Sequence, residues 1–181
     1  MQNKFELRKF AKDFRKTLNI KEVSEKILQI FFNTDIYNNA KNIALYYPIG
    51  DELDITPILA NKDKIFFLPK INDNDEMFFA KYDANKSLIN GKYNIPEPSD
   101  IEKIDLNILD IMIVPGLMAD KNGHRLGYGK GYYDKLFYHN NFAGLKVVFI
   151  PEKLFINNLP VDANDMPVDI IITENHVYKV K

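Results

Sequence analysis

The sequence contains no cysteine among its 181 residues. A disulfide framework, a thiolate metal site and a cysteine nucleophile are therefore excluded, and the absence fits a reducing compartment. Long apolar runs are missing too, because none approaches the roughly 18 residues that a membrane-spanning helix needs. The N-terminal segment MQNKFELRKF is charged and has no apolar centre, so no signal peptide is expected. These absences together predict a cytoplasmic protein without a membrane partner.

An excess of charge of one sign is also absent. The 24 Lys and Arg residues nearly balance the 25 Asp and Glu residues, and the formal net charge is −1. A protein that binds nucleic acid through a broad basic surface has a different balance, so no nucleic-acid partner is expected. Hydrophobic residues make up 46% of the chain, enough for one sizeable core. We expect a single monomeric domain over residues 1–181.

Short apolar runs alternate with amphipathic segments along the chain. The helical spacing of apolar residues predicts helices at 3–18, 21–32 and 132–139. Apolar runs predict strands at 43–47, 65–68, 77–82, 111–114, 147–150 and 168–173. Most of these runs do not alternate with polar residues, which is typical of parallel strands that are buried on both faces. The predicted fold class is therefore α/β, with a mostly parallel central sheet and helices on both faces.

The segment 114–134, VPGLMADKNGHRLGYGKGYYD, is the most distinctive part of the chain. Three alternate glycines precede a predicted helix, where glycine allows close ligand approach and unpaired amides attract anions. Arg125 and Lys130 add positive charge for phosphate oxygens, and Asp134 adds a hard oxygen ligand suited to Mg²⁺. The segment predicts a phosphate-binding loop with a metal ligand. A tight surface turn is the alternative, since the segment matches neither the P-loop nor the dinucleotide fingerprint.

As a whole, this segment resembles the signature of the 5-formyltetrahydrofolate cyclo-ligase family, also called 5,10-methenyltetrahydrofolate synthetases. That signature has Pro-Gly after a strand, then an acidic residue, then R-L-G-x-G-x-G-Y-Y-D. The chain matches it at Pro115, Gly116, Asp120, Arg125, Leu126, Gly127, Gly129, Gly131, Tyr132, Tyr133 and Asp134. Further similarity is dense at 46–57, 65–71, 91–98 and 165–174. One departure is Tyr128, which stands where some members have Arg.

The resemblance implies which residues bind ATP. In the family, a K-x-x-x-R pattern near the N-terminus reaches toward the ATP phosphates, and Lys4 and Arg8 match it. Residues four apart share one face of a helix, although an ordinary solvated face is the alternative. The implied ATP-binding set is Lys4, Arg8, Arg125, Leu126, Gly127, Tyr128, Gly129, Lys130, Gly131, Tyr132 and Tyr133. Arg125 and Lys130 are the implied catalytic residues.

The resemblance also implies a folate site. The family binds the pterin through an acidic residue in a D-E-x-x-T loop after a strand, and Glu52 and Thr56 match this loop. A carboxylate suits the N–H donors on the edge of a pterin, whereas an exposed loop acid is the alternative. The implied substrate-binding residues are Tyr47, Glu52, Tyr128 and Tyr132.

Two aspartates are the implied Mg²⁺ ligands. Asp165 matches the first aspartate of a D-x-x-V-D pattern that helps to place the metal in the family, and Asp134 ends the signature. Asp162 is expected to be a solvated loop acid. Glu97 lies in a loop with two prolines and is expected to belong to a rigid connector rather than to contact a ligand.

The implied activity is the ATP-dependent cyclisation of 5-formyltetrahydrofolate to 5,10-methenyltetrahydrofolate, with release of ADP and phosphate. The formyl oxygen attacks the γ-phosphate and becomes a good leaving group, and N10 then attacks the same carbon. Phosphoryl transfer needs positioning and charge neutralisation, so cations, glycine amides and Mg²⁺ suffice. Two alternatives are a sugar-phosphate isomerase or acyl-CoA-type enzyme on a similar sheet, and a nucleotide- or folate-binding regulator without turnover.

Overall fold

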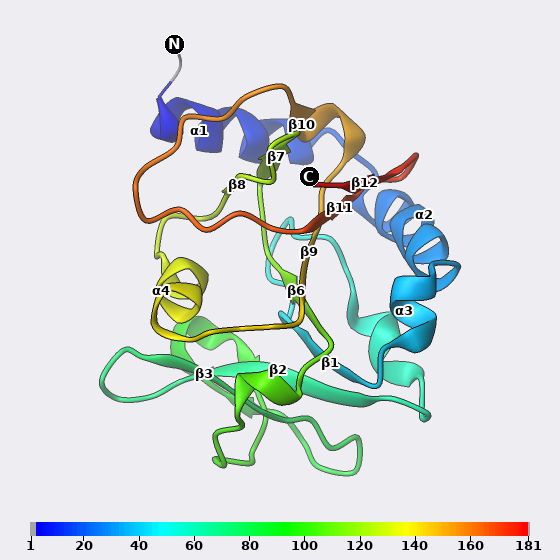
Figure 1. Cartoon of the computed structure of the whole chain (residues 1–181), viewed down its shortest axis with the longest axis vertical. Coiled ribbons are helices and arrows are strands. Elements are labelled where there is room, and N and C mark those ends of the chain that lie inside the picture. Colours follow the sequence, from blue (N-terminus) through cyan, green and yellow to red (C-terminus); the bar gives the residue numbers. More distant parts are fainter. Residues whose placement is uncertain (1–2, 181) are drawn as a thin grey trace.

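One seven-stranded sheet forms the centre of the protein in a computed structural model that describes residues 3–180 (Figure 1). Its strand order is β12-β11-β9-β6-β1-β2-β3. The strands are β1 (Asn42–Leu45), β2 (Ile65–Ile71), β3 (Met77–Lys81), β6 (Ile111–Val114), β9 (Leu145–Phe149), β11 (Ile170–Ile172) and β12 (Val177–Lys179). The five central strands pair in parallel, and the edge strands β3 and β12 pair antiparallel. The predicted mostly parallel sheet is confirmed.

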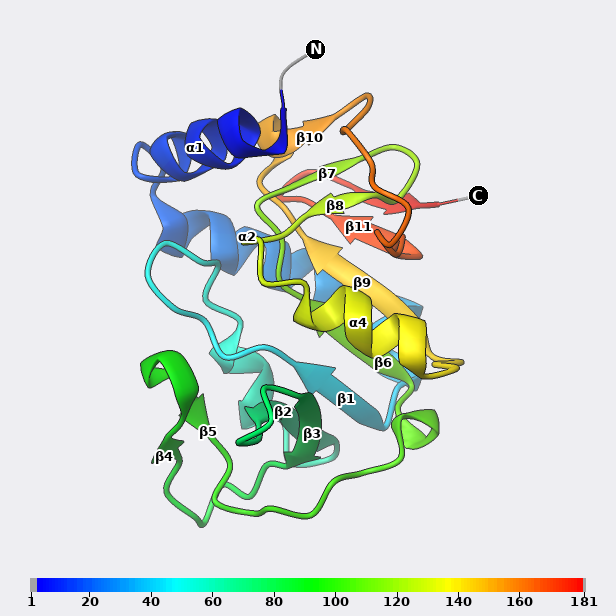
Figure 2. The same ribbon diagram turned by 90° about the vertical axis from the view of Figure 1, so that its left-hand side faces the viewer.

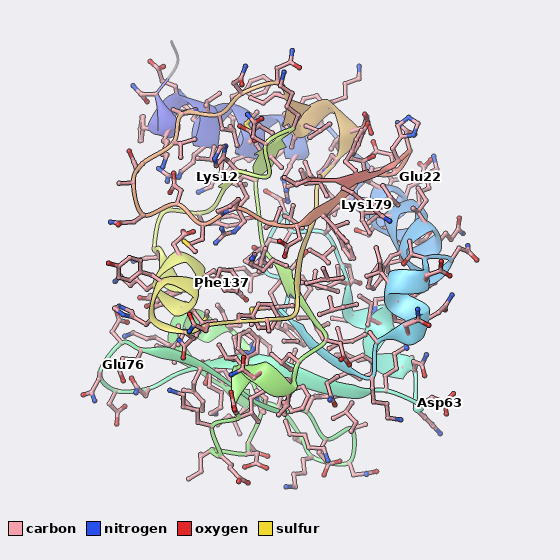
Figure 3. All side chains as sticks on the ribbon, viewed as in Figure 1. Lys12, Glu22, Asp63, Glu76, Phe137 and Lys179 are labelled. Carbon is pink, nitrogen blue, oxygen red and sulfur yellow. The ribbon has the colours of Figure 1, made fainter. Side chains whose placement is uncertain are left out.

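Helices cover both faces of this sheet, as predicted. The helices are α1 (Lys4–Arg15), α2 (Ile20–Phe32), α3 (Asp35–Asn39) and α4 (Tyr132–His139). Successive strand residues point to opposite faces, so Ala44 packs in the cluster under α1 and α4, while Ile43 and Leu45 pack under α2 and α3. In Figure 1, α4 and the pair α2–α3 lie on opposite sides of the sheet. Figure 3 shows Phe137 of α4 toward the sheet, whereas Glu22 lies at the periphery.

Helix α1 is shorter than its apolar pattern predicts. Asn3 and Glu6 form a capping box at its start, which fixes the first turn. The predicted end at residue 18 is wrong, because the amides of Thr17 and Leu18 bond three residues back and form a tight turn. Asn19 then caps α2 through its side chain, so the second helix begins directly after this turn.

Several short elements complete the fold. A second sheet, in the order β10-β7-β8, is formed by β7 (Met118–Asp120), β8 (Arg125–Leu126) and β10 (Phe155–Ile156). A small hairpin is formed by β4 (Ile89–Asn90) and β5 (Pro96–Glu97). The 3₁₀ turns are η1 (Thr56–Ala60), η2 (Lys92–Asn94), η3 (Leu106–Ile108) and η4 (Glu152–Leu154). The last predicted strand, 168–173, is limited to β11 and continues into the antiparallel β12. Within residues 3–180, no helix is long and apolar enough to cross a membrane.

The topology brings helix α1, the loop after β1 and the loop after β6 to one end of the main sheet. The loop that carries Glu52 follows β1, and Pro115 follows β6, its parallel neighbour. Ligands of such sheets bind beyond the carboxyl ends of the strands. The small sheet lies beside α1 in both Figure 1 and Figure 2, and the glycine segment runs from it to the start of α4.

Candidate active site

A cavity of about 550 Å³ lies at this end of the sheet. Every residue that the sequence assigns to ATP, folate or metal lines it. These are Lys4, Arg8, Tyr47, Glu52, Arg125, Leu126, Gly127, Tyr128, Gly129, Lys130, Gly131, Tyr132, Tyr133, Asp134 and Asp165. The cavity therefore unites side chains as far apart as Lys4 and Asp165, which are separated by 161 positions in the sequence.

The glycine segment has a backbone that ordinary residues rarely adopt. Gly129 and Gly131 have φ angles of +102° and +70°, in the left-handed region that favours glycine. Arg8 of helix α1 holds the glycine segment in place, because its Nε donates a hydrogen bond of 2.9 Å to the carbonyl of Gly127. Gly131 is the N-cap of α4 and offers no side chain to bond the first amides. Those amides and the helix dipole suit an anion at the cavity wall.

Three charged groups join α1 to the loop before β11. Nζ of Lys4 donates to Asp162 at 2.7 Å and to Asp165 at a shorter distance. Burial alone would lower the pKa of Lys4, but the two carboxylates outweigh it and the pKa is raised. Burial alone would likewise raise the pKa of Asp165, yet Lys4 and the amide of Asp162 lower it. Asp162 is a largely exposed loop acid, as expected, but it also contacts Lys4 and lines the cavity.

The two cations of the signature are held differently. Arg125 is almost fully buried and donates at 3.0 Å to both Asp134 Oδ1 and the carbonyl of Met166. The amide of Met166 donates to the same Asp134 oxygen at 3.2 Å. Lys130 is exposed, and its Nζ lies 5.1 Å from the ring centroid of Tyr93. Among residues 3–180, no hydrogen bond or salt bridge involves the Lys130 side chain.

Glu52 is buried rather than an exposed loop acid. Its side chain accepts a hydrogen bond of 2.9 Å from the amide of Ile49. Burial raises the pKa of Glu52, while the Ile49 amide, Tyr128 and Arg15 act in the opposite direction. Burial also raises the pKa of Tyr128, so its hydroxyl stays neutral beside the carboxyl group. A buried carboxylate with few partners is a strong acceptor for ligand N–H groups.

These contacts divide the cavity lining into two groups. We call Lys4, Arg8, Arg125, Lys130, Asp134, Asp162 and Asp165 the charged side. We call Tyr46, Glu52, Tyr128 and Tyr133 the buried side. Tyr46 donates to the Leu53 carbonyl at 3.0 Å, and the hydroxyl of Tyr133 is buried without a partner among residues 3–180.

The two implied metal ligands lie on the charged side. The hydrogen bonds that Asp134 accepts end on Oδ1, and those that Asp165 accepts end on Oδ2. One oxygen of each carboxylate is thus without a partner in the described part of the chain. That part contains no group of three or more His, Asp or Glu residues that could hold a metal ion. The donor set fits Mg²⁺, which takes one or two carboxylates and completes its shell with phosphate and water.

Sequence reasoning missed several residues of this site. The turn of the β4–β5 hairpin contacts the signature through Tyr93, whose hydroxyl lies 3.0 Å from the hydroxyl of Tyr132. The hydroxyl of Tyr132 also donates a hydrogen bond of 2.6 Å to Asp75. Glu97 was expected in a rigid connector, and its carboxylate is buried against Lys70 at 3.5 Å. Neither hairpin contact has a pattern in the sequence that could have shown it. Arg15, which contacts the two loops beside the cavity, was missed as well.

Comparison with known proteins decides the family. The model of the 5-formyltetrahydrofolate cyclo-ligase family matches residues 1–174. The chain belongs to this family. The cyclo-ligase of Mus musculus is 29% identical over 154 residues, which cover 77% of this chain and 76% of the mouse protein. The cyclo-ligase of Haemophilus influenzae is 27% identical over 160 residues, which cover 83% and 86%.

Solved structures show the same relationship. The NMR structure of Aquifex aeolicus 5,10-methenyltetrahydrofolate synthetase matches with a TM-score of 0.87 and 35% identity, covering 98% of this chain and 93% of that one. The synthetase of Mycoplasma pneumoniae matches with a TM-score of 0.74 over 96% and 99% of the chains. At 23% identity, the latter shows a common fold. Membership of the cyclo-ligase family gives this chain an ATP-dependent ligase activity, the cyclisation of 5-formyltetrahydrofolate to 5,10-methenyltetrahydrofolate. The predicted family, fold and activity are confirmed.

Proposed function

We propose that this cyclo-ligase binds both of its substrates in the cavity of about 550 Å³, with the ATP phosphates against the charged side and the pterin against the buried side. One observation carries the proposal. A single cavity is lined both by a glycine segment with an exposed Lys130, which forms no salt bridge among residues 3–180, and by a buried carboxylate, Glu52. The first combination suits a polyanion, and the second suits a neutral heterocycle with N–H donors.

On the charged side, Lys130 and Arg8 are cations that can bind phosphate without first breaking an ion pair, because neither forms a salt bridge among residues 3–180. Lys4 is engaged by Asp162 and Asp165, so a phosphate must share it with these carboxylates. Arg8 supports the segment through Gly127, and Arg125 keeps its buried pair with Asp134. Lys4, Arg8, Lys130 and the first amides of α4 therefore act on ATP, and Arg125 acts mainly by holding the signature in place.

On the buried side, Glu52 accepts hydrogen bonds from the pterin. Its only backbone partner among the described residues is the amide of Ile49, so acceptor positions are left for the 2-amino and N3–H groups. Tyr47, Tyr128 and Tyr132 line the same cavity and provide ring surfaces and hydroxyls for the folate.

The reaction proceeds by two displacements. The formyl oxygen attacks the γ-phosphorus, a C–O–P bond forms, and ADP leaves. N10 then attacks the formyl carbon, the C–O bond breaks, inorganic phosphate leaves, and the N10 proton is released. Lys130 and Lys4 neutralise charge that moves onto the phosphate oxygens, and the cavity holds the two reactants together.

Asp134 and Asp165 are the residues that would hold Mg²⁺ together with ATP. The metal would supply further charge neutralisation at the phosphates. A monomeric, cytoplasmic enzyme without nucleic-acid or membrane partners is part of the same proposal. The cysteine-free sequence and its net charge of −1 support this part.

Binding measured separately for each substrate tests the proposed arrangement. Lys130→Ala should weaken ATP binding by about 10- to 100-fold and leave folate binding near its wild-type value. Glu52→Gln should weaken folate binding and spare ATP. The matched controls are Lys179→Ala and Glu102→Gln, two exposed residues outside the cavity lining. Wild-type affinity for ATP in Lys130→Ala, or for folate in Glu52→Gln, would contradict the assignment of that side.

A further inference from the structure

Arg15 is a buried cation that none of the assignments above explains. Its side chain is 2% exposed, at the last position of α1. Leu7, Ala11 and Arg15 follow one another at intervals of four, so they lie on the same stripe of the helix and face the core. Among residues 3–180, Arg15 forms no salt bridge, and its Nε has no hydrogen-bond partner. A charge buried without an ion partner destabilises a fold unless other groups compensate it.

The compensating groups are carbonyls of two loops beside the cavity. One terminal nitrogen of Arg15 donates to the carbonyls of Gly116 at 2.5 Å and Leu117 at 3.3 Å. The other donates to the carbonyl of Asp51 at 3.4 Å. Asp51 immediately precedes Glu52, and Gly116 follows Pro115 of the cavity lining. A single guanidinium therefore connects α1, the loop after β1 and the loop after β6.

We propose that Arg15 positions Glu52 for the folate, by fixing the backbone next to Glu52 and by placing a positive charge near its carboxylate. The inference rests on the proposed role of Glu52 as the pterin acceptor. Arg15 does not line the cavity, so it acts through Glu52 rather than by contact with the substrate.

A cation near Glu52 opposes the effect of burial on the charge state of this carboxyl group. Burial raises the pKa of Glu52, and a protonated carboxyl group would present an O–H to a pterin edge that itself carries donors. The groups that face Glu52 are Arg15 from α1, Tyr46 from the end of β1, Tyr128 from the glycine segment and Tyr133 from α4. Three of them are neutral phenols, and Arg15 is the cation among them.

The shape of the side chain matters as well as its charge. A guanidinium is planar and presents several N–H donors in a fixed fork, which matches carbonyls on two loops. An ammonium would carry the charge to the same region with a smaller reach. Arg15→Lys therefore retains the charge and loosens the loops, while Arg15→Met removes both.

The test is the pH profile of kcat/KM for 5-formyltetrahydrofolate, with KM for ATP measured in parallel. In Arg15→Met, the acid limb of the profile should move to higher pH, kcat/KM for the folate should fall at least about tenfold, and KM for ATP should stay within about twofold. In Arg15→Lys, KM for the folate should rise while the acid limb keeps its wild-type position. Lys16→Met changes the exposed neighbouring cation and should match the wild type in every measurement.

The Glu52→Gln background separates this inference from the function on which it rests. If Glu52→Gln itself has wild-type folate kinetics, the proposed pterin role of Glu52 is wrong. If Glu52→Gln impairs folate use, adding Arg15→Met should produce no further shift of the pH profile. An acid limb that is unmoved in Arg15→Met, or a loss shared equally between folate and ATP, would overturn the role of Arg15 alone. If Arg15→Met does not fold, Arg15→Lys decides, because an unchanged folate KM in that variant contradicts the proposal.

Discussion

The two sides of the cavity use charge in different ways. On the charged side, opposite charges meet directly, as in Lys4 with Asp165 and Arg125 with Asp134. On the buried side, Glu52 has a backbone amide and phenols around it, and its cation acts from behind the cavity wall. Direct pairs can exchange partners with an incoming phosphate, whereas a carboxylate without a direct cation keeps its full acceptor strength for the ligand. In the proposed arrangement, one cavity thus handles a polyanion and a neutral heterocycle by separate means.

The largest effect should come from breaking the buried pair of the charged side. Arg125→Ala leaves Asp134 and the Met166 carbonyl without their donor, so we expect a loss of about 2–3 kcal/mol in the free energy of unfolding, together with loss of activity. Lys130→Ala should change the free energy of unfolding by less than about 0.5 kcal/mol, because Lys130 is exposed and unengaged. Urea denaturation of both variants measures this difference, and equal losses would show that Arg125 is no more structural than Lys130.

The next largest effect concerns the metal. Asp134→Asn keeps the size of the side chain and an oxygen for Arg125, but it removes the negative charge. We expect activity to fall and the Mg²⁺ midpoint to rise at least about tenfold. Asp165→Asn should shift the midpoint less. A magnesium titration of both variants gives the answer, and wild-type midpoints would leave these carboxylates as partners of Arg125 and Lys4 only.

A smaller difference in stability should distinguish alanine substitutions at two glycines of the same segment. Gly131→Ala meets no atom within 4 Å, yet its φ of +70° strains any other residue, so about 1 kcal/mol of stability should be lost. Gly127 also has open space around its Cβ position and no positive φ, so Gly127→Ala should be nearly neutral for stability. Thermal denaturation compares the two directly. A neutral Gly131→Ala variant would show that the segment relaxes freely.

The smallest effect should appear in the free energy of unfolding at acidic pH. The pKa of Asp165 is lowered in the folded protein, so its contribution to stability is present above the ordinary value of 3.8 and is lost as the pH falls below it. Lys4 is part of this lowering, and Lys4→Met should therefore flatten the acid limb of the stability curve by less than about 1 kcal/mol. Unfolding measured between neutral pH and pH 3 tests the sign. A steeper acid limb in the variant would contradict the prediction.

Sequence patterns predicted the elements that carry a continuous apolar run or a helical spacing of apolar residues. The central strands were found from their apolar runs, and α4 at Tyr132–His139 was found from its apolar spacing after the glycine segment. Strands β7, β8 and β10 were not found, because two or three residues are too few to show a period. Their pairing depends on tertiary contacts that bring residues 118–120 beside 155–156.

The residues of the candidate site also fall into those that the sequence could place and those that it could not. Residues in the signature could be placed in one cavity because the motif is continuous in sequence. Arg15 could not, since a basic residue near a helix C-terminus is ordinarily a solvated complement to the dipole. Its one signal was a spacing of four from Ala11, on the apolar stripe of α1. Asp162 likewise looked like any loop acid until the fold placed it against Lys4.

Helix α1 reaches the active site through contacts that span most of the chain. Lys4, Arg8 and Arg15 bond to residues 161, 119 and 101 positions later. The helix can coil as soon as it is synthesised, but the partners of Lys4 emerge from the ribosome long afterwards. Its apolar stripe, with Leu7 and Ala11, belongs to a core cluster whose members extend to Ile171. The first segment of the chain to be made therefore completes its contacts with the cavity only when the loop before β11 has been synthesised.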